Sequence, residues 1–536
     1  MNAATAVVVA LALTSWSPSS SRSQPSQPSQ SAQPSQPRVC ATMALLAATR
    51  TAHAQWNTGV DDLRPATTTT LDSAVHPLVL HFDAGVTPER AAFVMAIFDD
   101  AWEQQVTVAG FGPPLGDGAA GGDARFDVYV IPLGPGLGGI TLAKGDDDPN
   151  DGKQASSAFI EIDPTLPDDL LTVFSHHEFQ HALQFAIDIS EPIMWFESNA
   201  VFWEVRTRPD VADWVSSLPD FQAHPEVPIF GDAVRVDPFV DAPAPRFEYG
   251  AALFALYLDE VHGDGTGTLL RQIWQGCPET DGAANEPDFI DAMTAAGVDV
   301  PAAIADFSEW RALVGPLLST TDGPAAATLP IPEALPASAH LVAQALVAAT
   351  LDGRLVTTGD FDSPYALGCA MREVTAPNDV EALPVEIDAQ ATLPSQTLAL
   401  STLIIDGSSS TRVVGDAAAH VHASVSVPRN GLLQFAVCDV SPADPDDALA
   451  ARPIRLSVLR TDVSFPDAGP AADDAGVVVD GGTVKPPEPT CSCQGAGDPR
   501  NMRTGIAALG VLVSLFALGV RGLRARRRKA LFKRRE

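Results

Sequence analysis

The sequence predicts an α+β domain, a following all-β sandwich-like domain and a C-terminal transmembrane helix. In the α+β domain we expect a mixed sheet, then a central helix, then a helical subdomain. Three observations support this order: short branched and aromatic segments come first, helical spacing dominates residues 170–316, and short strand-like segments recur over residues 335–460. The expected boundaries are a leader at 1–54, the α+β domain at 55–320, the β domain at 335–460, a stalk at 461–490 and a terminal segment at 491–536.

The first half of the α+β domain contains three predicted strands and one predicted helix. Residues His76–Phe82, Arg125–Pro132 and Ser157–Asp163 are short, rich in branched or aromatic side chains and partly alternating, as strands are. Residues Pro88–Gln105 have apolar side chains at helical spacing, and Pro88 stands where proline is tolerated in a first turn. This half therefore supplies the sheet and one covering helix.

The motif His177-Glu178-Phe179-Gln180-His181 lies in the next predicted helix, Leu170–Ala186, which follows the breakers and acidic residues of Pro164–Asp169. On a helix, residues four apart share a face, so His177 and His181 can bind one metal ion. Glu178 then lies to the side, where a carboxylate can reach a metal-bound water. Two neutral imidazoles and a carboxylate base are the groups that a zinc hydrolase needs. A buried helix whose histidines only form hydrogen bonds is the alternative.

A tetrahedral zinc site needs a third protein ligand, and the segment after Pro192 offers two carboxylates. Glu197 and Glu204 are seven residues apart and lie on nearly the same face of the predicted helix. Because Glu204 would lie about 10 Å further along that helix, both cannot bind the same ion. From spacing alone, either can be the ligand.

The combination of H-E-x-x-H with Trp195-Phe196-Glu197 and Ala200 resembles the gluzincin metallopeptidases, and the flanking residues resemble a group of secreted metalloproteases from myxobacteria. The resemblance implies a zincin-like catalytic domain that binds Zn²⁺ through His177, His181 and Glu197 and hydrolyses protein or peptide substrates. It makes Glu178 the general base, with Glu204 outside the ligand set. The alternatives are an inactive adhesion or scaffold protein on the same fold, and a zinc hydrolase of a non-peptide bond.

Tyr249 is the candidate for stabilising the oxyanion. Related aminopeptidases carry a tyrosine for this role in a Y-x-x-G context, whereas here Tyr249 directly precedes Gly250. The residue lies near the start of a predicted helix, Tyr249–Val261. It is therefore either an oxyanion donor or a core tyrosine whose hydroxyl is satisfied elsewhere.

Two glycine-containing segments between the predicted strands suggest other sites. Gly134–Gly139 matches G-x-G-x-x-G, but Ile140-Thr141-Leu142 continues as a strand rather than opening a helix, which argues against a dinucleotide site. We expect a loop that leads into an edge strand over the cleft, and we expect substrate to pair with the edge strand near Ser157–Ile162. Asp146–Gly152 has the carboxylate density of a structural Ca²⁺ loop, or it is a solvated acidic turn.

The β domain at 335–460 is predicted from five short strand-like segments broken by Gly, Pro and Asp: Leu355–Thr358, Val385–Asp388, Leu398–Ile405, Val421–Val427 and Leu432–Val437. Cys369 and Cys438 fall within it, and an oxidising compartment permits a disulfide between them. Cys277 then has no partner. No residue pattern identifies a ligand of this domain.

Both ends of the chain indicate export. Residues 1–54 end in Ala52-His53-Ala54, a signal-cleavage pattern before Gln55. Cys491-Ser492-Cys493, the apolar stretch 504–520 and a following basic cluster predict a single-pass anchor and resemble the MYXO-CTERM sorting tail, which implies display at the cell surface or release after processing. With 67 acidic and 33 basic residues, the chain repels polyanions, so nucleic acid is excluded as a partner.

Overall fold

The computed structural model describes residues 64–134, 136–144, 154–231, 246–278, 287–314, 343–346, 351–357, 364–407, 409–445 and 450–462. The leader at 1–54, the acidic segment Asp146–Gly152 and the terminal segment 491–536 lie outside these residues, as does the stalk beyond residue 462. By its contacts the chain divides into two units, 1–465 and 466–536, and every described residue belongs to the first.

A five-stranded mixed sheet opens the described chain, as the sequence predicts. Its strands lie in the order β1 (Thr69–Asp72), β2 (Leu78–Phe82), β3 (Phe126–Val130), β5 (Ala158–Ile162) and β4 (Gly139–Ala143). β2, β3 and β5 are parallel, whereas β1 and β4 pair antiparallel at the two edges. The prediction that Ser157–Ile162 forms the edge is wrong, because β5 lies between β3 and β4. The expected edge strand after the glycine loop is confirmed as β4.

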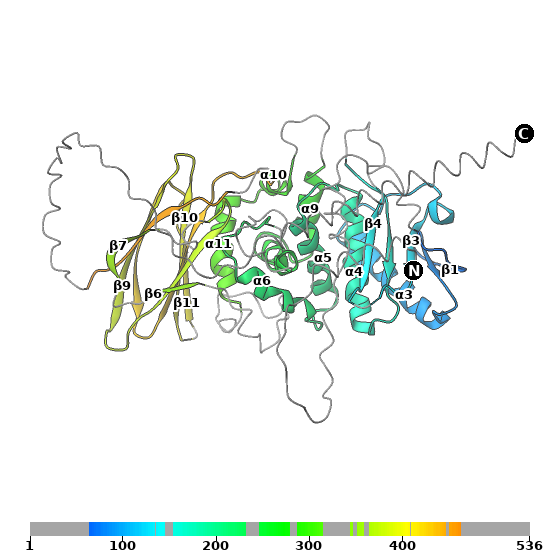
Figure 1. Ribbon diagram of the computed structural model, residues 1–536, viewed down its shortest axis with the longest axis horizontal. Coiled ribbons are helices and arrows are strands. Elements are labelled where there is room, and N and C mark those ends of the chain that lie inside the picture. The colour runs from blue at the N-terminus through cyan, green and yellow to red at the C-terminus, as the bar shows by residue number, and fades with distance from the viewer. Residues whose placement is uncertain are drawn as a thin grey trace, which may run out of the picture. The chain divides into compact units, whose positions relative to one another are not determined.

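Two helices, α3 (Pro88–Trp102) and α4 (Asp168–Phe185), pack on each other and close the main core with the sheet (Figure 1). Thr87 begins α3 by accepting a hydrogen bond from the amide of Arg90, and Pro88 occupies the first turn. Residues 103–108 continue α3 as a π-helical turn. Alternate residues of the inner strands face the helices, so Leu80, Val128 and Ile160 join the same core as Phe179 of α4.

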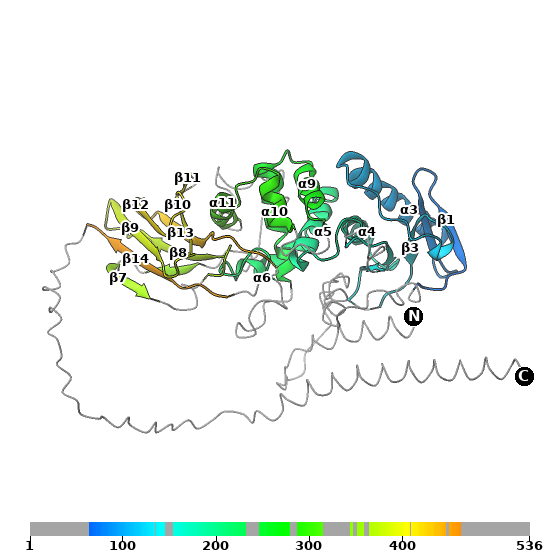
Figure 2. The ribbon, with the colours of Figure 1, turned by 90° about the horizontal axis from the view of Figure 1, so that it is seen from above.

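The helical subdomain follows, with α5 (Ile193–Thr207), α6 (Leu218–Gln222), α7 (Phe247–Gly250), α8 (Ala252–Tyr257), α9 (Thr268–Gly276), α10 (Phe289–Ala295) and α11 (Val300–Ala312). Figure 2 shows α9 and α10 side by side. The single helix predicted over Tyr249–Val261 is divided into α7, α8 and a π-helical turn at Leu258–His262. Gly250 lies at the division, where a Cβ atom would be 2.6 Å from the carbonyl oxygen of Ser217.

The all-β part consists of two sheets with a shared apolar core. One sheet has the order β11 (Ser409–Val414), β10 (Leu398–Asp406), β13 (Leu432–Asp439), β8 (Cys369–Thr375), β6 (Gln344–Leu346), and the other the order β12 (His420–Pro428), β9 (Ala382–Ala391), β14 (Ile454–Arg460), β7 (Asp352–Thr357). The predicted disulfide joins Cys369 to Cys438 on the neighbouring strands β8 and β13. Cys277 is a buried free thiol.

α11 connects the helical subdomain to the first of these sheets. The Ser401 hydroxyl on β10 donates to Glu309, and the hydroxyls of Ser308 and Ser401 lie 3.0 Å apart. Asp306 also contacts Arg412 of β11. Among the described residues, no helix is long and apolar enough to span a membrane, and the predicted anchor at 504–520 lies outside them.

Candidate metal centre

The two histidines of the motif lie on one face of α4. His177 and His181 are one helical turn apart, and their Nε2 atoms are 3.1 Å from each other. Both side chains are completely buried. Asp168 and Asp169 occupy the first turn of α4, where carboxylates interact favourably with the helix dipole. The local sequence thus forms a helix that presents two imidazoles toward the same point.

α5 brings Glu197 to these two imidazoles. Its Oε2 atom lies 3.1 Å from Nε2 of His177 and 3.7 Å from Nε2 of His181. Burial alone raises the pKa of the Glu197 carboxyl, but hydrogen bonding to His177 and His181 outweighs burial and lowers this pKa to about 2. The ligand atoms of the three residues lie within 4.8 Å of one another, and no other such group of His, Cys, Asp or Glu occurs in the described residues.

The other ring nitrogen of His177 faces Glu204. Nδ1 lies 2.6 Å from Oε1 of Glu204, which is also on α5. Sequence spacing treats Glu197 and Glu204 as competitors for the ion, whereas the structure brings both to His177 on opposite nitrogens. A carboxylate in this position fixes the ring orientation and raises the basicity of the metal-facing nitrogen. Asp213 lies close enough that desolvation, and then the charge of Glu204, raise its pKa to about 7.

His181 is oriented by a residue of its own helix. Its Nδ1 lies 2.8 Å from Oε1 of Gln184, and Nε2 of Gln184 donates to the carbonyl oxygen of Phe196. Because an amide oxygen only accepts, Nδ1 carries the proton and Nε2 can face the metal. Sequence reasoning assigned no role to Gln184. Its position three residues after His181, on the same helix face, was the available signal.

Glu178 lies against the edge strand β4. The hydroxyl of Thr141 is 2.7 Å from Oε2 of Glu178 and 2.8 Å from its backbone carbonyl oxygen. A Cβ atom on Gly139 would lie 2.5 Å from Cγ of Glu178, so glycine provides the space for this side chain. Sequence reasoning did not identify Thr141, because its contact with Glu178 spans 37 positions of the chain.

Tyr249 lies beside the candidate ligands. Its ring stacks on that of His177, with centroids 6.2 Å apart and planes inclined by 17°. The side chain is partly exposed, whereas the rest of α7 is buried. The structure thus places Tyr249 next to an imidazole of the candidate metal centre, in α7 rather than in a long helix.

The donor set fits a zinc ion. Two imidazole nitrogens and one carboxylate oxygen converge, which is a ligand set of catalytic zinc sites, where water takes the fourth position. The set contains no thiolate, and hard cations such as Ca²⁺ prefer oxygen ligands alone. His177, His181 and Glu197 are therefore the residues that would bind such an ion.

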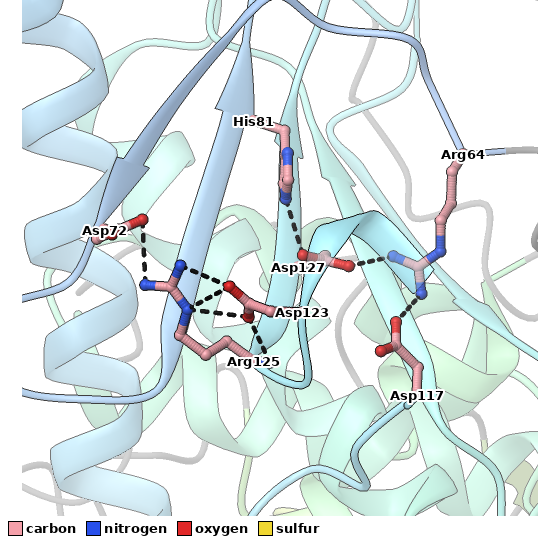
Figure 3. Close-up of polar contacts among 7 residues, drawn as sticks. All are labelled: Arg64, Asp72, His81, Asp117, Asp123, Arg125 and Asp127. Carbon is pink, nitrogen blue, oxygen red and sulfur yellow. Dashed lines mark hydrogen bonds and ion pairs between the residues drawn. The ribbon is translucent and has the colours of Figure 1, made fainter. Parts of the chain in front are cut away.

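A second group of charged residues surrounds His81 of β2 and Asp127 of β3 (Figure 3). His81 lies 2.8 Å from Asp127, and Arg64 bridges Asp127 and Asp117. Arg125 pairs in turn with Asp72 and Asp123. The carboxylates face cationic groups, so this cluster attaches residue 64 and the segment 117–125 to the sheet.

Comparison with known proteins gives no family for the chain. No family model matches, and no curated protein matches. Among the solved structures that match is one titled "CorA is a surface-associated copper-binding protein important in Methylomicrobium album BG8 copper acquisition". It shares 10% identity, covers 21% of this chain and 89% of its own, and has a TM-score of 0.14. So low a score supports no conclusion about fold or function.

Proposed function

We propose that the chain is a zinc-dependent metallopeptidase of the gluzincin type, with a zincin-like catalytic domain. The convergence of His177, His181 and Glu197 supports this proposal most directly, because it combines a catalytic zinc ligand set with a neighbouring carboxylate, Glu178. The ligand residues come from two helices that follow a mixed sheet.

In this proposal, zinc when bound supplies Lewis-acid activation of a water molecule and of the scissile carbonyl. Glu178 takes a proton from the attacking water and later delivers it to the leaving amine. Glu204 and Gln184 hold His177 and His181 in orientation. Tyr249, which stacks beside His177, is the proposed donor to the oxyanion.

The proposed substrate is an extended peptide that pairs with the outer edge of β4. β4 bonds to β5 on one side only, so its other edge is available for strand addition within the described sheet. We further propose export and display at the cell surface, with attachment through the C-terminal segment. A structural Ca²⁺ at Asp146–Gly152, outside the described residues, stays a prediction.

A second candidate is a metal-binding surface protein without catalysis. Complete burial of His177, His181 and Glu197 favours this second candidate. Catalysis requires that substrate reach the ion, whereas a protein that only binds metal can keep its site closed. A zinc hydrolase of a non-peptide bond is a lesser alternative, since the same ligands and base can serve it.

Cleavage of a peptide library, followed by mass spectrometry, separates these functions. The purified full-length chain is compared with Glu178→Ala and with Glu103→Ala, which changes an exposed glutamate. We expect one zinc per chain in all three, and chelator-sensitive cleavage that falls about 10²–10⁴-fold only in Glu178→Ala. Stoichiometric zinc without any cleavage would favour the non-catalytic or non-peptide function. Undiminished cleavage by Glu178→Ala would refute its role as base.

A further inference from the structure

The edge strand β4 contributes directly to the candidate centre. Ile140 and Leu142 face away from α4, in an apolar cluster with Phe159. Gly139 and Thr141 alternate with them and face α4, where both meet Glu178. The face of β4 that carries Gly139 and Thr141 therefore packs against Glu178, the proposed base.

The hydroxyl of Thr141 is shared between two acceptors. It lies 2.7 Å from Oε2 of the Glu178 side chain and 2.8 Å from the Glu178 carbonyl oxygen. A threonine hydroxyl carries one proton, so it cannot donate fully to both. The carbonyl lies inside α4 and also accepts the helical amide hydrogen bond four residues on. The Glu178 carboxylate therefore depends on the Thr141 hydroxyl more than the Glu178 carbonyl does.

Gly139 also restricts the side chain of Glu178. A Cβ atom at this position would lie 2.5 Å from Cγ and 2.7 Å from Oε1 of Glu178. These distances are far below van der Waals contact, so Glu178 packs directly on the backbone of β4. Packing against Gly139 and hydrogen bonding to Thr141 together define one rotamer for the base.

We propose that Thr141 is a positioning residue for hydrolysis, whose hydroxyl holds the Glu178 carboxylate on β4 in the orientation that meets the attacking water. The inference rests on the proposed function, because it assigns a role only where Glu178 is the base. A general base accelerates the reaction only when its carboxylate is aligned with the attacking water, and a small displacement of a reacting group lowers the rate strongly.

The test compares Thr141→Val, which removes the hydroxyl at nearly equal volume, with Thr141→Ser, which keeps it. Thr172→Val is the matched control, because that hydroxyl bonds only to a backbone carbonyl of α4. We expect Thr141→Val to lower kcat about 10–100-fold, with KM changed by less than about threefold. Thr141→Ser restores most of the rate, and Thr172→Val leaves kcat unchanged.

Two readouts besides activity complete the test. Zinc affinity, measured by chelator competition, stays within about threefold of wild type in Thr141→Val, since the candidate ligands are His177, His181 and Glu197 and Thr141 bonds to Glu178. In zinc-free protein, Thr141→Val lowers the thermal midpoint by about 3 °C, and by much less in the Glu178→Ala background.

The outcomes distinguish the positioning role of Thr141 from the proposed peptidase function. Peptide cleavage that is equal in wild type and Thr141→Val overturns the role of Thr141 and leaves the peptidase intact. Equal midpoint losses in both backgrounds overturn the contact itself. A wild type that binds zinc but cleaves nothing overturns the proposed function, and the positioning role fails with it.

Discussion

Loss of Glu204 should weaken zinc binding although Glu204 is not a ligand. Its carboxylate lies 2.6 Å from Nδ1 of His177, and His177 is 0% and Glu204 5% exposed. Glu204→Ala removes the acceptor that fixes this ring in a site nearly closed to water. Removing the hydrogen-bond partner of a metal-bound histidine typically weakens metal affinity about 10–100-fold. This loss corresponds to about 1.4–2.8 kcal/mol of binding free energy.

The assay is a competition titration of zinc between the protein and a chromophoric chelator. Glu226→Ala is the matched control, because Glu226 also contacts an imidazole Nδ1, that of His224 at 3.2 Å, which is not a candidate ligand. We expect a weaker Kd for Glu204→Ala only. Unchanged affinity in Glu204→Ala would refute the reasoning, and so would an equal loss in Glu226→Ala.

Three further predictions concern single residues. Glu197→Ala should lower zinc affinity more than Glu204→Ala does, because it removes a ligand rather than the support of one; a smaller loss in the same titration contradicts this assignment. Gly139→Ala should lower kcat with zinc binding retained, since its Cβ would displace Glu178; steady-state kinetics with unchanged kcat would refute this. Burial raises the pKa of Glu309 to about 8. The unfolded chain therefore loses this proton at lower pH than the folded chain, and the free energy of unfolding falls as pH rises from about 5 to 8. Denaturant melts should show a shallower fall in Glu309→Gln, and parallel slopes would contradict this.

The sequence predicts elements whose signals are local. Spacing along one helix locates His177 and His181, and the strands β2, β3 and β5 follow from short branched segments. In the β domain, four strands were missed: β6, β8, β11 and β14. β8 carries Cys369 and a buried arginine, Arg372, which interrupts its apolar pattern. A buried charge in a strand is recognisable only from its surroundings.

Sheet order and the surroundings of the base could not be predicted in the same way. β5 and β4 are both short and apolar, and which one lies at the edge depends on pairing across the sheet. The wrong choice of edge also hid Thr141, whose contact with Glu178 exists only once β4 packs on α4. Spacing along the helix correctly brought Glu204 into consideration, but only as a rival of Glu197 for the metal ion. Its contact with the other ring nitrogen of His177 depends on how α5 packs on α4.

The two carboxylates around His177 determine what the centre can hold. Nδ1 lies 2.6 Å from Glu204 and Nε2 lies 3.1 Å from Glu197, whose lowered pKa of about 2 keeps it ionised. An ionised carboxylate only accepts hydrogen bonds, so in the metal-free site Glu197 favours a proton on Nε2 of His177. A metal ion at Nε2 takes the place of this proton. Proton and metal ion therefore compete for the same nitrogen, and the carboxylate that α5 supplies, not the motif on α4 alone, sets this competition.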